Sequence, residues 1–225
     1  MKLRRILKTG QPYSFRQYFD LPFTLEDILA EFDCTFVRSP LARLRRSPLA
    51  RLRPLATLRE RRSHIDLPRQ PFTAAIEPLL HQLQRNRKRI ELINETARRE
   101  ALIAPILFEV VDLTNHRIYI EYSIAVSEHL RGTLDYYIAN HNLIVIEAKQ
   151  SDLVRGFTQL AVELVALDQW LQSDQRILYG IVTTGEDWRF GTFNRQERSI
   201  QQDPKRYIVP EELTELLEIL VGIMT

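Results

Sequence analysis

Apolar and polar residues recur with two different periods along this chain. Apolar residues return at helical spacing from Ile76 to Val111, with many charges between them, and again from Leu153 to Leu171. Other stretches are short and rich in β-branched and aromatic residues, which is typical of strands. The predicted strands are Arg117–Val126, Leu134–Ala139, Leu143–Ala148, Ile177–Thr184 and Trp188–Phe193.

The order of these elements predicts the fold class. A helix comes first, then three strands, a second helix, two strands and a last helix that runs from Pro210 to Met224. Pro105 should kink or divide the first helical stretch, since proline lacks the backbone donor that a helix interior uses. This order predicts an α/β protein with a mixed sheet of about five strands flanked by helices.

Residues 1–37 form an aromatic-rich N-terminal segment. Thr24 has the side chain of a helix N-cap, and Asp27 three residues later completes a partial capping box. We therefore expect a short helix through Phe32. The segment is interpreted as a small packing element on the main core, although a partner-docking site is an alternative.

Residues 38–62 form an arginine-rich insertion built on an internal repeat. Residues 38–45 and 46–53 both read RSPLARLR, and the prolines deny the segment a continuous helix. Nine arginines and one acid give it a charge of +8, which leaves −6 for the rest of a chain whose net charge is +2. We favour a poorly ordered surface loop over an arm that binds phosphates, because basic runs are often only solvated segments.

Several classes of protein are excluded by what the chain lacks. No apolar run approaches the ~20 residues that span a bilayer, and the N-terminal residues carry no signal peptide. The single cysteine, Cys34, rules out an internal disulfide and a cysteine-rich zinc site. No serine-hydrolase, zinc-protease or phosphate-loop motif occurs, and the five histidines lack metal-ligand spacing. A cytoplasmic protein is the simplest interpretation.

The candidate chemistry lies on a predicted hairpin. If Asn140-His141-Asn142 is a three-residue loop, Asp135 lies opposite Glu147 on the same face of the sheet. Two carboxylates so close repel each other, and a divalent cation between them removes that cost. A two-residue loop would instead place Asp135 opposite Ile146 and send it to the other face.

Lys149 lies one step further along the face of Glu147, where an ammonium group can hold a water molecule or a phosphate oxygen. The chain has five lysines and 26 arginines, so a lysine here is informative. The alternative to a catalytic site is an ordinary cross-strand salt bridge. A second tripeptide of this type, Asp203-Pro204-Lys205, is assigned to a polar loop and discarded.

Asp135 followed by Glu147-Ala148-Lys149 resembles the PD-(D/E)XK nuclease superfamily. The resemblance is closest to the nuclease domain at the N-terminus of type I restriction motor subunits, and it covers about residues 90–195. Residues 94–107 are similar to that family's leading helix, and YGIVTTGEDWRFGTF is similar to its last strand pair. The resemblance implies a restriction-endonuclease-like fold for a domain of residues 63–225.

The resemblance also implies roles for individual residues. Asp135, Glu147 and the carbonyl of Ala148 would bind Mg²⁺ or Mn²⁺, and Lys149 would orient the attacking water. A glutamate of the leading helix joins the site in that family. Spacing does not choose between Glu95 and Glu100, but the family pattern favours Glu95. Gln159 matches the family's usual glutamine, with a solvated helix residue as the alternative, while Glu163 stands where some relatives have tyrosine.

The expected function is therefore metal-dependent hydrolysis of phosphodiester bonds, with DNA as the expected substrate. The alternative is a non-catalytic nucleic-acid-binding or complex-assembly protein on the same fold. The intact Asp135, Glu147 and Lys149 set favours the enzyme, and the charge of −6 outside the insertion favours the alternative. The sequence leaves open the substrate form, the specificity, and whether the chain forms a homodimer or joins a larger restriction- or repair-type complex.

Overall fold

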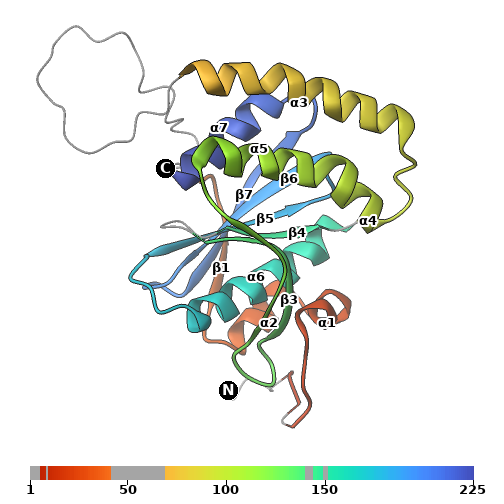
Figure 1. Ribbon diagram of the computed structural model, residues 1–225. Coiled ribbons are helices and arrows are strands. Elements are labelled where there is room, and N and C mark those ends of the chain that lie inside the picture. The colour runs from red at the N-terminus through yellow and green to blue at the C-terminus, as the bar shows by residue number, and fades with distance from the viewer. Residues whose placement is uncertain (1–5, 9, 42–68, 140–143, 149–151) are drawn as a thin grey trace, which may run out of the picture.

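The computed structural model describes residues 6–8, 10–41, 69–139, 144–148 and 152–225, and it gives the backbone alone for residues 69–71 and 144–148. Within those residues the chain is an α/β protein with one mixed sheet, as the sequence predicts (Figure 1). Seven described strands form the sheet, in the order β1-β7-β6-β5-β4-β3-β2. They are β1 (Thr35–Arg38), β2 (Ile118–Ala125), β3 (Arg131–Ile138), β4 (Ile144–Ala148), β5 (Ile177–Thr183), β6 (Asp187–Asn194) and β7 (Ser199–Ile208).

Helices cover both faces of the sheet (Figure 1). One core lies between the sheet and α3 (Arg69–Arg89), α5 (Ala104–Thr114) and α7 (Leu213–Met224). The other lies between the sheet and α6 (Leu153–Trp170), with α1 (Phe15–Asp20) and α2 (Leu25–Ala30) packed beside it. The described strand pairs are antiparallel except β1 with β7 and β4 with β5.

Glycines in the middle of the sheet let α6 lie very close to it. A Cβ built on Gly191 would come within 2.6 Å of the Phe157 ring, and one built on Gly180 within 2.9 Å of the ends of Leu160 and Leu164. Those distances are below van der Waals contact, so only glycine fits without a shift in its neighbours. The close approach sets how deeply the side chains of α6 are buried.

The two strands that the sequence analysis missed are β1 and β7, so the expected count of five is corrected to seven described strands. The segment of β7 is polar and contains Pro204, which argues against a central strand. The pairing explains why proline is tolerated. β1 pairs only with Ser199–Gln202, so beyond that point this side of β7 carries no described strand, and the register with β6 shifts between Arg189 and Gly191.

The tripeptide Asp203-Pro204-Lys205 therefore lies in β7, at the register shift, and not in a polar loop. Asp203 is only 2% exposed and accepts hydrogen bonds from the backbone N–H of Leu41 and of Lys205, at 3.2 and 2.9 Å. The ammonium of Lys205 lies 2.6 Å from a carboxylate oxygen of Glu215. Both charged groups have structural partners, and the prediction that this tripeptide lies in a polar loop is wrong.

The helical stretch predicted from Ile76 to Val111 is divided at two places, after Arg89 and at the π-turn just before Pro105. A break follows α3, then come α4 (Glu95–Arg98), a π-helical turn η2 (Arg99–Ile103) and α5, with Pro105 in the first turn of α5. Proline is tolerated there because η2 directly precedes α5, and a π-helical turn interrupts the regular hydrogen bonds that a proline in a helix cannot make. The π-turn supplies the irregularity that was expected from the proline.

The N-terminal segment does more than pack on the core. Thr24 caps α2 as predicted, accepting from the backbone N–H of Asp27 at 3.2 Å. The segment also adds β1 to the sheet, beside β7. The insertion assigned to residues 38–62 begins inside this fold, since Arg38 ends β1 and Leu41 is buried in the core. The remainder of the insertion lies outside the described residues.

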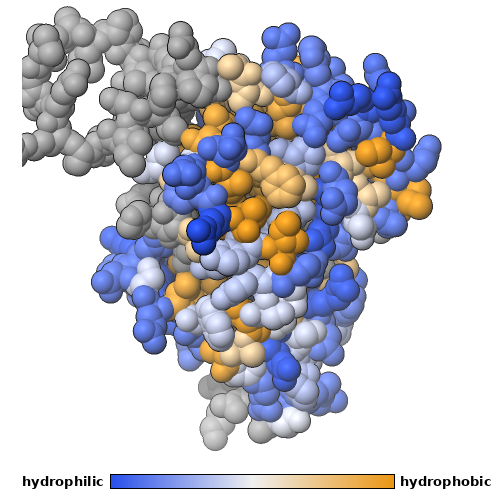
Figure 2. All heavy atoms as spheres, viewed as in Figure 1, coloured by the Kyte–Doolittle hydropathy of each residue, from blue (hydrophilic) through white to orange (hydrophobic). Residues whose placement is uncertain are grey.

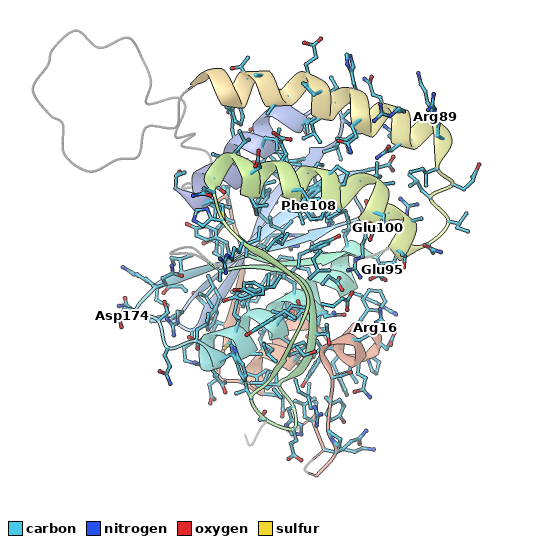
Figure 3. All side chains as sticks on the ribbon, in the orientation of Figure 1. Arg16, Arg89, Glu95, Glu100, Phe108 and Asp174 are labelled. Carbon is cyan, nitrogen blue, oxygen red and sulfur yellow. The ribbon has the colours of Figure 1, made fainter. Side chains whose placement is uncertain are left out.

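Apolar residues also reach the surface. Figure 2 shows them gathered over α5, where Phe108 is 46% exposed and points outward (Figure 3). Among the helices described, none combines the length and the apolar character that crossing a bilayer requires.

The close contact between α6 and the sheet gives a first prediction. Gly191→Ala should lower the free energy of unfolding by about 1–3 kcal/mol, because the new methyl group meets the rigid Phe157 ring and the Gln201 carbonyl oxygen. Gly180→Ala is the matched control and should lose less, since it meets only the flexible ends of leucines. Urea unfolding measures both. The explanation fails if Gly191→Ala is neutral, or if adding Phe157→Leu does not restore stability.

Candidate functional site

The hairpin register that the site depends on is confirmed for the described backbone. Tyr136 pairs with Ile146, Tyr137 with Val145 and Ile138 with Ile144. Extended by one step, the same register sets the backbone of Asp135 opposite that of Glu147. The two-residue loop considered above would have paired Asp135 with Ile146, and this pairing excludes it.

Parts of the predicted site lie outside the described residues. These are Lys149, the hairpin loop 140–143, and the side chain of Glu147. The backbone of Glu147 and Ala148 is described, and it pairs in parallel with Val182 and Thr183 of β5. Both residues therefore lie at the carboxyl end of β4, which is followed after residues 149–151 by α6.

Asp135 is a buried carboxylate next to an arginine. It is 8% exposed, and its Oδ1 lies 3.8 Å from Nη1 of Arg99. The same nitrogen lies 2.5 Å from Oε1 of Glu121, and the guanidinium lies over the Tyr136 ring at 5.2 Å. The pKa of Arg99 is raised: burial opposes the charge, but the hydrogen bond to Glu121 and the charge of Asp135 outweigh burial. Arg99 is thus a fixed cation at the predicted site.

Glu121 lies on β2, at the position that the flanking pairs set across from Asp135. The pairs Ile120 with Tyr136 and Tyr122 with Leu134 flank this position. Glu121 has φ of 54°, which is uncommon for a residue other than glycine and often marks a functional or strained position. Glu121, Asp135 and Glu147 therefore occupy one row across three neighbouring strands at the level of the backbone.

The arginine comes from an irregular part of the leading helix. Asn94 caps α4, accepting from the backbone N–H of Ala97 at 2.8 Å. Arg99 begins the π-turn η2, and such turns are frequent at functional sites. A glycine in the turn between β5 and β6 supports η2, since Gly185 has φ of +89° and its missing Cβ would lie 2.8 Å from the Cβ of Leu102.

The leading helix brings two glutamates to this side of the molecule (Figure 3). Glu95 is half-buried in the first turn of α4, and Glu100 is exposed in η2. Burial raises the pKa of Tyr136, and the carboxylates of Glu100 and Asp135 add to this effect. Glu100 and Asp135 therefore both act on Tyr136, so Glu100 is a candidate for the site as well as Glu95.

Gln159 is not a solvated helix residue. It is 3% exposed, and its amide donates a hydrogen bond of 2.9 Å to Oε1 of Glu163, which is fully buried one turn later. Burying an amide and a carboxylate costs free energy unless their polar atoms form hydrogen bonds. The alternative interpretation of Gln159 as a solvated helix residue is therefore wrong, and Glu163 is its hydrogen-bond partner.

A hollow of about 450 Å³ lies at the carboxyl ends of β4 and β5. Three arginines line it together with the N-cap residue of α6, an acid of the β5–β6 turn and the first residue of β6, namely Arg98, Arg189, Arg206, Asp152, Glu186 and Asp187. Arg206 and Arg189 lie 2.5 and 3.6 Å from the same oxygen of Asp187. The hollow is large enough for a small ligand and is lined by charge of both signs.

The described side chains alone do not complete a metal site. No group of three histidine, cysteine or acidic residues gathers among them, and Glu147 is outside that set. The expected donors are two carboxylates and a backbone carbonyl, which are the oxygen ligands that Mg²⁺ uses. Asp135 fits such a site, because it is buried and already draws a cation towards it.

The chain matches no family model, no curated protein and no solved structure.

Sequence reasoning missed Arg99 and Glu121. A signal for Glu121 was present, since it is the one charged residue within the strand sequence IYIEYSIA. Its partner Arg99 lay in the stretch assigned to the leading helix, but an arginine on a charged helix gives no distinguishing signal. Only the fold brings the two residues together.

The arginine between the carboxylates gives a second prediction. Arg99→Met keeps the length of the side chain and removes its charge, so Asp135 and Glu121 lose a shared cation. The free energy of unfolding should fall by about 1–3 kcal/mol, as for a largely buried ion pair that loses one partner. Adding Glu121→Gln should recover part of the loss. Arg176→Met is the control and should lose less than about 1 kcal/mol, because its pair with Glu197 is exposed. Equal losses would contradict this account.

A tyrosine cluster beside the site gives a third prediction. Burial raises the pKa of Tyr137 to about 12, and Tyr122 and Tyr119 add to the effect. The unfolded chain has the ordinary value of about 10, so the stabilisation is full below pH 10 and is lost as pH rises from 10 through 12.

Tyr137→Phe should therefore lose less stability than the wild type across this range, by about 1–2 kcal/mol at pH 11.5. Urea unfolding at pH 8, 10 and 11.5 measures the difference. Tyr119→Phe is the control, since Tyr119 is 41% exposed. Parallel curves for the wild type and Tyr137→Phe would show that this hydroxyl does not titrate with unfolding.

Proposed function

We propose that this chain is a divalent-metal-dependent nuclease with a restriction-endonuclease-like fold, and that it hydrolyses phosphodiester bonds in nucleic acid, with DNA as the expected substrate. The observation that carries the proposal is the register of β3 and β4. It aligns the backbone of Asp135 with that of Glu147, as the PD-(D/E)XK arrangement requires. Had the strands paired one residue apart, no such proposal could stand.

The residues would divide the work as follows. Asp135, Glu147 and the carbonyl of Ala148 would hold Mg²⁺ or Mn²⁺, which supplies Lewis acidity against the negative charge of the phosphodiester. Lys149 would orient the attacking water. Glu95 or Glu100 would complete the surroundings of the carboxylates, and Gln159, which is buried in α6, would take the role of the family's usual glutamine.

Basic residues near the site support a nucleic-acid substrate. The last turn of α3 carries Arg87, Lys88 and Arg89, and Arg98 lines the hollow beside β4. Figure 3 places Arg89 above Glu95 and Glu100 on one side of the molecule, and Arg16 below them. Cationic groups on both sides of the site offset the acidic balance of the chain outside its insertion, and they suit a phosphate backbone.

The proposal predicts a defined loss of function. Lys149→Ala should reduce cleavage at least 100-fold, the scale of removing a group that positions a reactant, and should leave metal affinity unchanged or higher. Asp135→Asn should lose both metal binding and cleavage. Plasmid, single-stranded and branched DNA are incubated with and without Mg²⁺ or Mn²⁺, and metal binding is followed by calorimetry.

Lys205→Ala is the matched control, because Lys205 belongs to a tripeptide of the same type whose charges have structural partners. It should cleave at the wild-type rate. If Lys149→Ala also cleaves at that rate, the proposed mechanism is wrong. If no DNA form is cut with any metal, yet DNA is bound, the alternative of a non-catalytic nucleic-acid-binding protein holds instead.

A further inference from the structure

A second hollow lies between the N-terminal helices and the first turns of α6. It measures about 530 Å³ and is bounded by α1, α2, the end of β1 and α6. Figure 1 shows α1 and α2 beside α6, on the side of the sheet away from α3, α5 and α7. A hollow of this size admits a ligand as large as a nucleotide, since small-molecule sites begin at about 300 Å³.

The walls of this hollow are aromatic, and one of them is unusually exposed. Phe19 and Phe36 are half-buried, while Phe23, in the loop between α1 and α2, is 39% exposed. The floor is polar, with Thr158 and Gln202 only 8% and 5% exposed. An apolar peptide would have little use for a hydroxyl and an amide at the base of its groove.

Two arginines stand at the rim. Arg38 at the end of β1 and Arg155 in the first turn of α6 are both exposed and line the hollow, together with one acid, Glu26. Aromatic faces, buried polar groups and guanidinium groups are the combination that unpaired nucleotides require. Bases stack on the rings, their edges form hydrogen bonds with the polar groups, and phosphates pair with arginine.

The hollow also adjoins the candidate nuclease site. Val154, 65% exposed, lines both this hollow and the one that contains Arg98 and Asp152. A strand bound over Phe23 would therefore cross the first turn of α6 and reach the carboxyl end of β4. A duplex keeps its bases stacked and paired, so it cannot offer them to these rings without opening.

We propose that this aromatic hollow binds unpaired nucleotides of a nucleic-acid strand. This inference rests on the proposed function. The substrate is then single-stranded or branched, and its unpaired strand leads to the nuclease site. Phe23 is a stacking residue, Arg38 and Arg155 contact phosphates, and Thr158 and Gln202 face the bases.

Binding without cleavage tests this proposal directly. Fluorescein-labelled oligo(dT) and a duplex of equal length are titrated with the full chain in EDTA, and anisotropy is measured. The wild type should bind the single strand at least tenfold more tightly than the duplex. Phe23→Ala should weaken single-strand binding roughly 5- to 100-fold, the effect of losing one stacked base. Arg155→Ala should also weaken it and reduce its salt dependence.

Phe108→Ala is the matched control, an exposed aromatic residue on α5 across the sheet, and it should bind as the wild type does. Phe23→Trp should retain binding, which separates stacking from a general effect on folding. Equal affinity for both DNA forms, or wild-type binding by Phe23→Ala, overturns the proposal.

The two proposals fail in different ways. Glu147→Ala should lose cleavage and keep single-strand binding in EDTA. Single-strand binding that depends on Phe23, without cleavage by any metal, would refute the nuclease and leave this inference standing. Metal-dependent cleavage of duplex DNA that is insensitive to Phe23→Ala would do the reverse.

Discussion

The candidate site depends on one constraint, the register of the hydrogen-bonded ladder between β3 and β4. Side chains alternate across a strand, so a slip of one residue would exchange the two faces along the whole hairpin. Apolar residues do not fix this register by themselves, because Tyr136 and Tyr137 are both buried, one in each core. The parallel pairing of β4 with β5 also holds it, since it fixes the position of β4 against the centre of the sheet.

The depth of α6 on the sheet is a second constraint, and it acts on the candidate residue Gln159. Gly180 and Gly191 leave no Cβ between the sheet and the helix, so Phe157 and Leu160 reach the backbone of β5 and β6. Gln159 and Glu163 lie on the same helix and are buried with them. A larger residue at either glycine would lift α6 and expose this polar pair to water. The packing that stabilises the core thus also keeps this polar pair out of solvent.

The sequence predicted the elements whose signals are local. The hairpin strands and the capped helix at Thr24 follow from side-chain periodicity and a capping residue, whereas the hairpin register was chosen because it brings Asp135 opposite Glu147. It failed where a long-range contact overrides the local pattern. Pro204 hid β7, because only the tertiary register reveals that this side of the strand has no described neighbour there. The contact of Arg99 with Asp135 and Glu121 could not be predicted for the same reason. It joins three elements that no local sequence pattern relates.

The charges at the site explain how an acidic row can persist in a folded chain. Asp135 lies opposite Glu121 on one side and, by register, opposite Glu147 on the other, and like charges at such spacing destabilise a sheet. Arg99 offsets part of this repulsion, and the π-turn and the Gly185 contact hold the segment from which it extends. A divalent ion bound by the same carboxylates would compete with this arginine for Asp135. Under the proposed function, the affinity for that ion would depend on how strongly Asp135 interacts with Arg99, the cation that the fold supplies.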